Sequence, residues 1–194
     1  MFENLSKYQI ILASNSPRRK ELLQRLGLEF KVRTLLGVDE SYPDSLKGEE
    51  IARYISSQKA AAYRPTMADD ELLITADTIV CTTDGTVLGK PFAFEKAAEM
   101  LHMLSGKTHH VITGVTIVTK DRTENFSVTS EVKFAELTDK EICYYIENYL
   151  PYDKAGAYGI QEWIGLVAVE ELHGSFFNVM GLPVQRLYTI LKTF

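Results

Sequence analysis

The chain has 194 residues, of which 45% are hydrophobic and 24% are charged, and its formal net charge is -5 at pH 7. These values are typical of one globular α/β domain, and the acidic balance argues against broad nucleic-acid binding. No apolar run approaches a membrane span, and residues 1–4 do not resemble the start of a signal peptide. Cys81 and Cys143 lie far apart in apolar segments, which predicts reduced core thiols. We therefore expect a cytoplasmic protein without a membrane or nucleic-acid partner.

Hydrophobic patterning predicts alternating strands and helices in a single domain that spans residues 1–194. Strands are expected at residues 8–13, 30–33, 72–81, 86–88, 111–118, 125–134 and 166–169, and helices at 17–26, 45–63, 94–104, 139–149 and 183–191. Asp84 and Gly85 indicate a hairpin turn, and Thr138 with Glu141 forms the pattern of a capping box. The mixture favours an α/β or α+β sheet over a regular doubly wound one.

Three cations stand at the start of the first predicted helix, directly after the N-cap candidate Ser16 and Pro17. Arg18, Arg19 and Lys20 lie at the positive end of the helix dipole, where each exposed cation costs about 0.3–1 kcal/mol. A bound anion would reverse this penalty, because backbone N–H groups and guanidinium groups both bind phosphate. The segment therefore predicts a local anion site, and a basic helix end in solvent is the alternative.

A carboxylate interrupts the apolar strand at residues 72–81. Asp77 is costly to bury, so it needs hydrogen-bond donors, a cation or a catalytic role, unless it belongs to a turn at the strand end. Lys90 follows the return strand of the hairpin and could lie beside Asp77, although most lysines are simply exposed. Lys59 suits the end of its helix through the dipole alone, and Glu40 by itself reads as a solvated loop charge.

The segment 154–161 is rich in small residues around a single aromatic ring. Two glycines and two alanines surround Tyr158, which allows the backbone to approach a flat ligand, and Gln161 offers both a donor and an acceptor. A tight structural loop is the alternative. The four histidines lack the spacing of a zinc site, and neither a Walker A motif nor a dinucleotide-binding fingerprint is present.

Taken together, these segments resemble the Maf family of nucleoside triphosphate pyrophosphatases. The similar segments are, in chain order, Leu12–Leu23, Ala76–Val80, Gly89–Pro91, Leu104–His109, Asp153–Gln161 and Gly181–Pro183. The resemblance implies the fold shared with the inosine triphosphatase group, an elongated mixed sheet with flanking helices and two lobes around a central nucleotide cleft. It also implies hydrolysis of a nucleoside triphosphate to the monophosphate and pyrophosphate with Mg²⁺ or Mn²⁺, and a homodimer.

The same resemblance implies roles for individual residues. Asp77 matches the catalytic acid/base, and Glu40 and Asp77 match the metal site. Substrate specificity is expected from Arg18, Thr78 and Gln161, and phosphate binding from Ser16, Arg19, Lys59 and Lys90. The loop that ends in Gln161 is similar to the branch acting on dTTP and UTP, and differs from the branch acting on 7-methyl-GTP. Two alternatives remain: a nucleotide-binding regulator of cell division and septum formation, which would not need Asp77, and a purine-nucleotide enzyme of the same fold.

Overall fold

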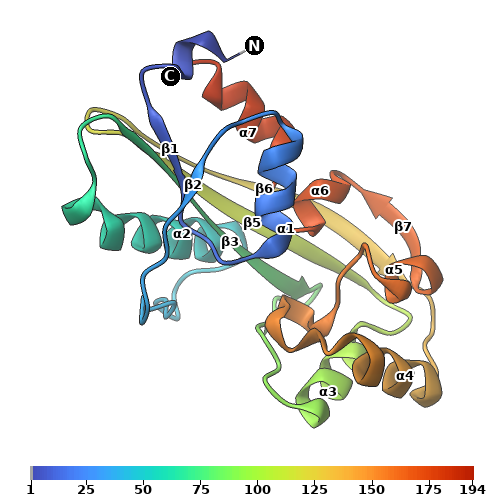
Figure 1. The fold of residues 1–194 in the computed structure, drawn as a ribbon. Helices are drawn as coiled ribbons and strands as arrows, with labels where there is room; N and C mark the ends of the chain where they lie inside the picture. Colours follow the sequence, from blue (N-terminus) through green and yellow to red (C-terminus); the bar gives the residue numbers. More distant parts are fainter. Residues whose placement is uncertain (1) are drawn as a thin grey trace. The chain divides into compact units, whose positions relative to one another are not determined.

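The computed structural model describes residues 2–194 as alternating strands and helices (Figure 1). The strands are β1 (Gln9–Leu12), β2 (Lys31–Val32), β3 (Glu71–Thr82), β4 (Val87–Leu88), β5 (Thr108–Val118), β6 (Thr123–Phe134) and β7 (Val169–His173). The α-helices are α1 (Pro17–Arg25), α2 (Glu49–Tyr63), α3 (Phe94–Leu104), α4 (Asp139–Tyr149), α5 (Trp163–Val167), α6 (Phe176–Val179) and α7 (Val184–Leu191). Short 3-10 helices occupy Glu3–Leu5, Arg64–Thr66, Pro151–Asp153 and Ala155–Ala157. Among the described residues, no helix is both long and apolar enough to cross a membrane.

The strands form one mixed, seven-stranded sheet in the order β2-β1-β3-β5-β6-β7, and β4 pairs with β3. β1 runs parallel to β2 and β3, with Ile11 opposite Leu73 in the β1–β3 pair. The β3–β4 and β6–β7 pairs are antiparallel. Parallel neighbours need a crossover connection, which α1 supplies between β1 and β2. The predicted class, a mixed α/β sheet with flanking helices, is confirmed.

The chain divides into two compact units. The first contains the described residues up to Asp77, together with Thr113–Val128 and Gly181–Phe194. The second contains Thr78–Ile112 and Thr129–Met180. β3, β5 and β6 therefore each contribute residues to both units.

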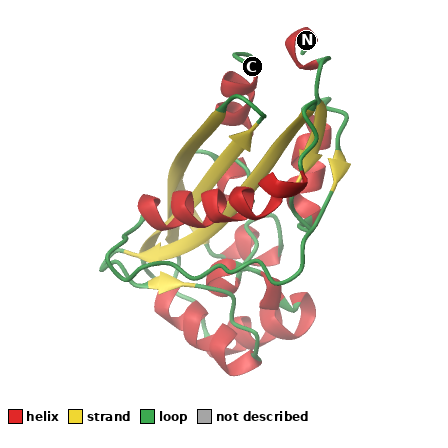
Figure 2. Cartoon of the chain, turned by 90° about the vertical axis from the view of Figure 1, so that its left-hand side faces the viewer, coloured by secondary structure: helices red, strands yellow, loops and turns green. Residues whose placement is uncertain are grey.

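In the first unit, α2 lies unusually close to the strands, and Figure 2 shows it laid across them. A Cβ atom added at Gly114 of β5 would lie 2.1 Å from the carbonyl oxygen of Ala52 in α2. Polar contacts hold the same face: the Thr75 hydroxyl donates to the Ser56 carbonyl at 2.7 Å, and the Ser56 and Thr116 hydroxyls lie 3.0 Å apart. Glycine at position 114 is thus required by the close approach of helix and strand.

The second unit has a buried aromatic cluster. The rings of His109, Phe134 and Tyr158 meet edge to face, with centroids 4.9 to 5.5 Å apart, and His109 Nε2 lies 2.8 Å from the Tyr158 hydroxyl. Burial lowers the pKa of His109 to about 4, so this ring is neutral at pH 7. The predicted capping box at the start of α4 is confirmed, because Thr138 and Glu141 each bind the backbone N–H of the other.

Some predicted boundaries shift for identifiable reasons. α2 begins at Glu49 rather than at Ser45, because Gly48 adopts a φ of 48° at the N-cap. The strand predicted at 30–33 is reduced to two residues, Lys31–Val32. Cys81 is buried as expected, whereas Cys143 is only partly buried, so its prediction as a core thiol was wrong.

The strand predicted at residues 166–169 is wrong. Trp163–Val167 form the short helix α5, and β7 begins only at Val169 and pairs with β6. Leu166 is exposed rather than part of a buried strand. A short apolar run has no periodicity that distinguishes a helix from a buried strand, so tertiary contacts determine the conformation of this segment.

We expect Gly114→Ala to destabilise the protein, because the new methyl group would push α2 away from β5. The expected loss is about 3 kcal/mol, with a fall in Tm of roughly 6–12 °C in thermal melting. Gly89→Ala is the matched control, since no atom lies within 4 Å of a Cβ added there. Equal melting temperatures for the two variants would contradict the close contact.

Candidate active site

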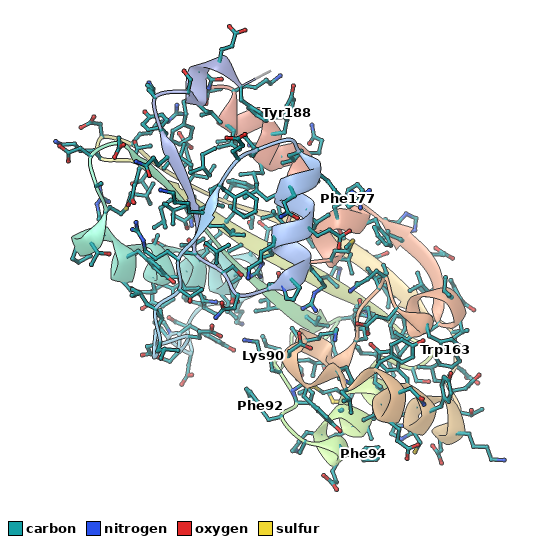
Figure 3. The ribbon with its side chains drawn as sticks, viewed as in Figure 1. Lys90, Phe92, Phe94, Trp163, Phe177 and Tyr188 are labelled. Atoms are coloured by element: carbon teal, nitrogen blue, oxygen red, sulfur yellow. The ribbon has the colours of Figure 1, made fainter. Side chains whose placement is uncertain are left out.

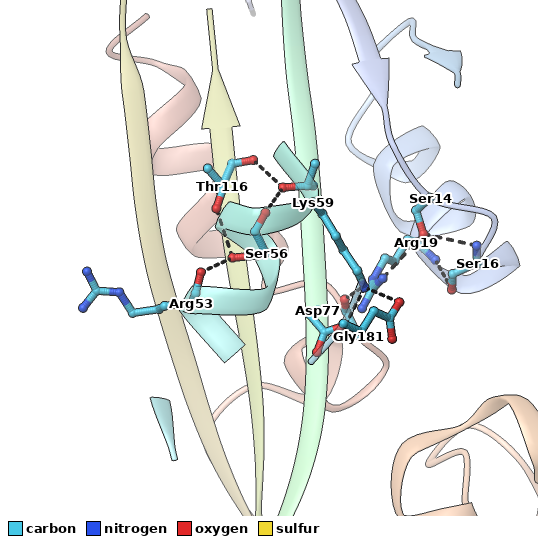
Figure 4. A network of polar contacts seen from close by, with 11 residues as sticks. Ser14, Ser16, Arg19, Arg53, Ser56, Lys59, Asp77, Thr116 and Gly181 are labelled. Atoms are coloured by element: carbon cyan, nitrogen blue, oxygen red, sulfur yellow. Dashed lines mark hydrogen bonds and ion pairs between the residues drawn. The ribbon is translucent and has the colours of Figure 1, made fainter. Parts of the chain in front are cut away.

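Asp77 is a buried carboxylate in β3 that forms an ion pair with Lys59 of α2. Only 8% of Asp77 is exposed, and the Lys59 Nζ atom lies 2.6 Å from its Oδ1 atom (Figure 4). The Lys59 side chain is itself only 13% exposed. Burying either charge alone would cost several kcal/mol, so each charge needs the other. The sequence-based expectation that Asp77 needs a cation or another polar partner is met by Lys59.

Glu40 completes a group of three charges. Its Oε1 atom lies 2.8 Å from the Lys59 Nζ atom, and its side chain is 46% exposed. Lys59 therefore bridges a buried carboxylate and a partly exposed one. From local sequence alone Glu40 is a solvated loop charge and Lys59 is a cation late in its helix. Glu40 does lie in an exposed loop and Lys59 does lie late in α2, but local sequence does not predict the ion pairs of Lys59 with both carboxylates.

The packing of α2 on the sheet explains why Lys59 reaches Asp77. Alternate residues of a strand share a face, so Asp77 lies on the same face as Thr75. Residues three apart on a helix also share a face, so Lys59 follows Ser56. The hydrogen bond from Thr75 to the Ser56 carbonyl thus sets the alignment that places the lysine over the carboxylate.

The start of α1 is an ordered, cation-bearing turn. Ser16 is the N-cap, as predicted, and its Oγ accepts the backbone N–H of Arg19 at 3.4 Å. The Arg19 guanidinium donates from Nε to the Gly181 carbonyl at 2.8 Å, and its Nη1 lies 3.5 Å from the Oγ of buried Ser14. The Arg19 side chain is therefore held in one orientation by the backbone (Figure 4).

Charges around Arg19 connect this turn to the carboxylates. Burial lowers the pKa of the Arg19 guanidinium, and the positive charge of Arg18 also lowers it. The negative charges of Asp77 and Glu40 act in the opposite direction and raise it. Arg19 therefore lies within electrostatic reach of both acidic residues and of Arg18. An N-terminal helix end with guanidinium groups beside it has the chemistry of a phosphate site.

Three of the predicted site residues belong to the second unit. Thr78 follows Asp77 in β3 and is half-buried. Lys90 is exposed in the segment after β4, from which Phe92 also projects (Figure 3). Gln161 is exposed in a turn before α5. The expected approach of Lys90 to Asp77 stays a prediction.

Sequence reasoning missed two groups of this site, Ser14 and the Gly181 carbonyl. Both lie in segments that the family resemblance singled out, and Gly181 has a φ of 112° that favours glycine. Nothing in those segments indicates that they hold Arg19. Within residues 2–194, no three His, Cys, Asp or Glu side chains are grouped to hold a metal ion.

Comparison with known proteins assigns the family. The model of the family described as Maf-like protein matches residues 9–194, which include most of the first unit, all of the second and every residue of the candidate site. The chain belongs to the Maf family. Maf relatives include proteins of Parabacteroides distasonis (63% identical over 194 residues, 100% of both chains) and Phocaeicola vulgatus (64% over 192 residues, 99% of each). A third, from Porphyromonas gingivalis, is 54% identical over 196 residues, covering 100% of this chain and 98% of its own.

All three Maf relatives are named dTTP/UTP pyrophosphatase. Among solved structures, a HAM1 protein from Coxiella burnetii is similar to this Maf chain with a TM-score of 0.53 and 14% sequence identity. The similarity covers 96% of this chain and 100% of that one. At this identity the similarity shows the fold alone.

We expect Lys59→Met to lower the free energy of unfolding by about 1–3 kcal/mol, because it leaves the buried Asp77 carboxylate with one partner fewer. Methionine keeps most of the side-chain length, so the loss reports the charge. Denaturant unfolding at pH 7 measures it. Glu40→Gln is the control and should cost less, since that carboxylate is partly solvated. A Lys59→Met protein as stable as the wild type would contradict the paired burial.

Proposed function

We propose that this chain hydrolyses dTTP and UTP to the nucleoside monophosphate and pyrophosphate. The observation that carries the proposal is the buried Asp77 carboxylate, paired with Lys59 at 2.6 Å and within electrostatic reach of Arg19. A carboxylate placed beside cations is suited to activating water next to a bound phosphate chain. The names of the Maf relatives support the choice of substrates.

In this proposal the triphosphate binds to Ser16, Arg19, Lys59 and Lys90. Arg19 is oriented in advance by the Gly181 carbonyl, so little reorganisation is needed when the substrate arrives. The basic helix start, which is unfavourable by itself, becomes favourable once phosphate oxygens accept hydrogen bonds there. These cations also stabilise the charge that develops on the pyrophosphate leaving group.

Asp77 is proposed as the general base. Its carboxylate accepts a proton from a water molecule whose oxygen attacks the α-phosphorus. The new P–O bond forms as the bond to the bridging oxygen of the β-phosphate breaks, and pyrophosphate leaves with that oxygen. Lys59 keeps the Asp77 carboxylate oriented through the ion pair.

The two carboxylates also fit a divalent cation. Glu40 and Asp77 each place an oxygen atom within 2.8 Å of the same lysine nitrogen, and Mg²⁺ commonly binds one or two carboxylates together with substrate phosphates. Glu40 and Asp77 would hold the cation. Mg²⁺ or Mn²⁺ bound there would neutralise phosphate charge and lower the pKa of a water molecule.

Gln161, Arg18 and Thr78 are proposed to select the base. The Gln161 amide offers a donor and an acceptor that match the imide edge of uracil or thymine. Cytosine reverses part of that pattern and would leave polar groups unpaired, at about 1–3 kcal/mol for each buried group. Uracil and thymine differ by one methyl group, which a pocket distinguishes weakly, so both dTTP and UTP are accepted.

We further propose that residues 1–194 act as one domain, since the Maf model spans both units. Two free cysteines are consistent with a cytoplasmic location. A homodimer is proposed from the resemblance alone. The alternative is a regulator of cell division that binds nucleotides without hydrolysing them, and the next experiment distinguishes the two functions.

Pyrophosphate release from a panel of nucleoside triphosphates, with and without EDTA, tests the activity. We expect dTTP and UTP to be hydrolysed best, and EDTA to abolish release. Asp77→Asn should lower kcat by about 100-fold or more and leave the Kd for dTTP within a few fold, because it removes a base but little volume. Asp121→Asn, in the exposed segment between β5 and β6, is the control. Near-normal turnover by Asp77→Asn would refute the role of this residue, and binding without turnover in the wild type would favour a regulator.

Gln161 should decide which base is used without changing the chemistry. Gln161→Glu removes the amide donor and adds a negative charge near the base carbonyls, so kcat/KM for UTP should fall by about tenfold or more, with a smaller effect on CTP. Gln161→Ala should lower discrimination among pyrimidines, and Gln185→Glu on the exposed face of α7 serves as the control. An unchanged UTP:CTP ratio in both Gln161 variants would show that the base is selected elsewhere.

A further inference from the structure

Gln161 is part of a tight turn in the second unit. The backbone N–H of Glu162 donates to the Gly159 carbonyl at 2.9 Å, which closes a four-residue turn with Gln161 as its third residue. Gly159 and Ile160 are buried, whereas Gln161 is exposed. The turn is therefore anchored on its inner side and presents one side chain to the outside.

One buried hydroxyl binds both ends of this turn. Tyr145 of α4 is fully buried, and its oxygen accepts the backbone N–H of Gly159 at 3.0 Å. The same hydroxyl donates to the Oε2 atom of Glu162. The first and last residues of the turn are thus tied to a single atom of a neighbouring helix.

A lysine holds the other oxygen of the Glu162 carboxylate. The Nζ atom of Lys154 lies 3.2 Å from the Oε1 atom of Glu162 and 2.9 Å from the Oδ1 atom of Asp153. The Lys154 side chain is 9% exposed and that of Glu162 is 19% exposed. Both carboxylate oxygens of Glu162 therefore have separate partners in a largely buried setting, which fixes the orientation of this side chain.

Two glycines show how tightly the turn is packed. A Cβ atom added at Gly159 would lie 2.9 to 3.1 Å from the carboxylate atoms of Glu162, and one added at Gly165 would lie 1.8 Å from the Ile160 carbonyl oxygen. Glycine at these two positions makes room for the Glu162 carboxylate and for α5. The ring of Tyr144 also meets the ring of Trp163, the first residue of α5, with centroids 4.9 Å apart. α4 therefore contacts the chain at both residues that follow Gln161.

We propose that Tyr145, Glu162 and Lys154 are positioning residues for base selection, and that they act through Gln161. Selection by an amide requires its donor and acceptor to be held within about 0.5 Å of the productive position. On a loose turn the Cα atom of Gln161 would shift and carry the amide away from that position. This inference deepens the proposed pyrimidine-nucleotide pyrophosphatase function and rests on it.

Tyr145→Phe tests the proposal by removing one oxygen atom and keeping the ring. We expect the ratio of kcat/KM for UTP to that for CTP to fall by about three- to tenfold, as a lost hydrogen bond to a charged group would allow. Tyr149→Phe is the matched control: its ring stacks on Tyr145 with centroids 5.1 Å apart, and among the described residues its hydroxyl takes no part in the network. A purely structural role predicts a lower Tm and equal losses for both nucleotides, with the ratio unchanged.

A double-mutant cycle decides whether Tyr145 acts through Gln161. In the Gln161→Ala background, Tyr145→Phe should leave the UTP:CTP ratio unchanged, because the side chain that it positions is already gone. The same fold-change in both backgrounds would overturn the proposal.

Glu162→Gln provides a second variant of the same network if Tyr145→Phe does not fold, and it is subject to the same cycle. Assays are run below the lowest Tm of the set. A wild-type protein that is inactive on UTP refutes the proposed function. An active wild type with an unchanged UTP:CTP ratio in the network variants refutes only the positioning role.

Discussion

The close approach of α2 to the sheet is the contact on which the candidate active site depends. Gly114 leaves room for the Ala52 carbonyl, and Thr75 binds the carbonyl of Ser56 on the same helix face. Only at this separation does Lys59 reach Asp77 and make the burial of its carboxylate tolerable. The stability of the first unit and the proposed chemistry therefore depend on the same helix–sheet contact.

Two features of the proposed mechanism, the Arg19 side chain and the turn that carries Gln161, are held by groups deeper in the protein. The backbone carbonyl of Gly181 holds Arg19, and Tyr145 holds the turn that carries Gln161. In both cases the holding group belongs to another element of the chain, so the Arg19 side chain and the backbone of the turn lose freedom during folding rather than during substrate binding. This arrangement transfers an entropic cost from recognition to folding.

Local rules predicted the parts of the structure that depend on neighbours in sequence, such as the N-cap at Ser16, the capping box at Thr138 and the hairpin at Gly85. The family resemblance added the positions of the site residues. The bridge formed by Lys59 could not be predicted, because it depends on how α2 is rotated and how closely it packs. The short helix α5 was missed for a similar reason, since a brief apolar run takes its conformation from tertiary contacts.

The chain passes between the two units at four places, and the first of them is the peptide bond that joins Asp77 to Thr78. The proposed general base thus ends the first segment of one unit, and a proposed specificity residue begins the first segment of the other. Because β5 and β6 are divided between the units in the same way as β3, a recombination event that exchanged one unit between homologues would cut three strands, one of them beside Asp77. Such an exchange would therefore disturb the sheet itself, whereas a point substitution at the exposed Gln161 would leave these strands intact.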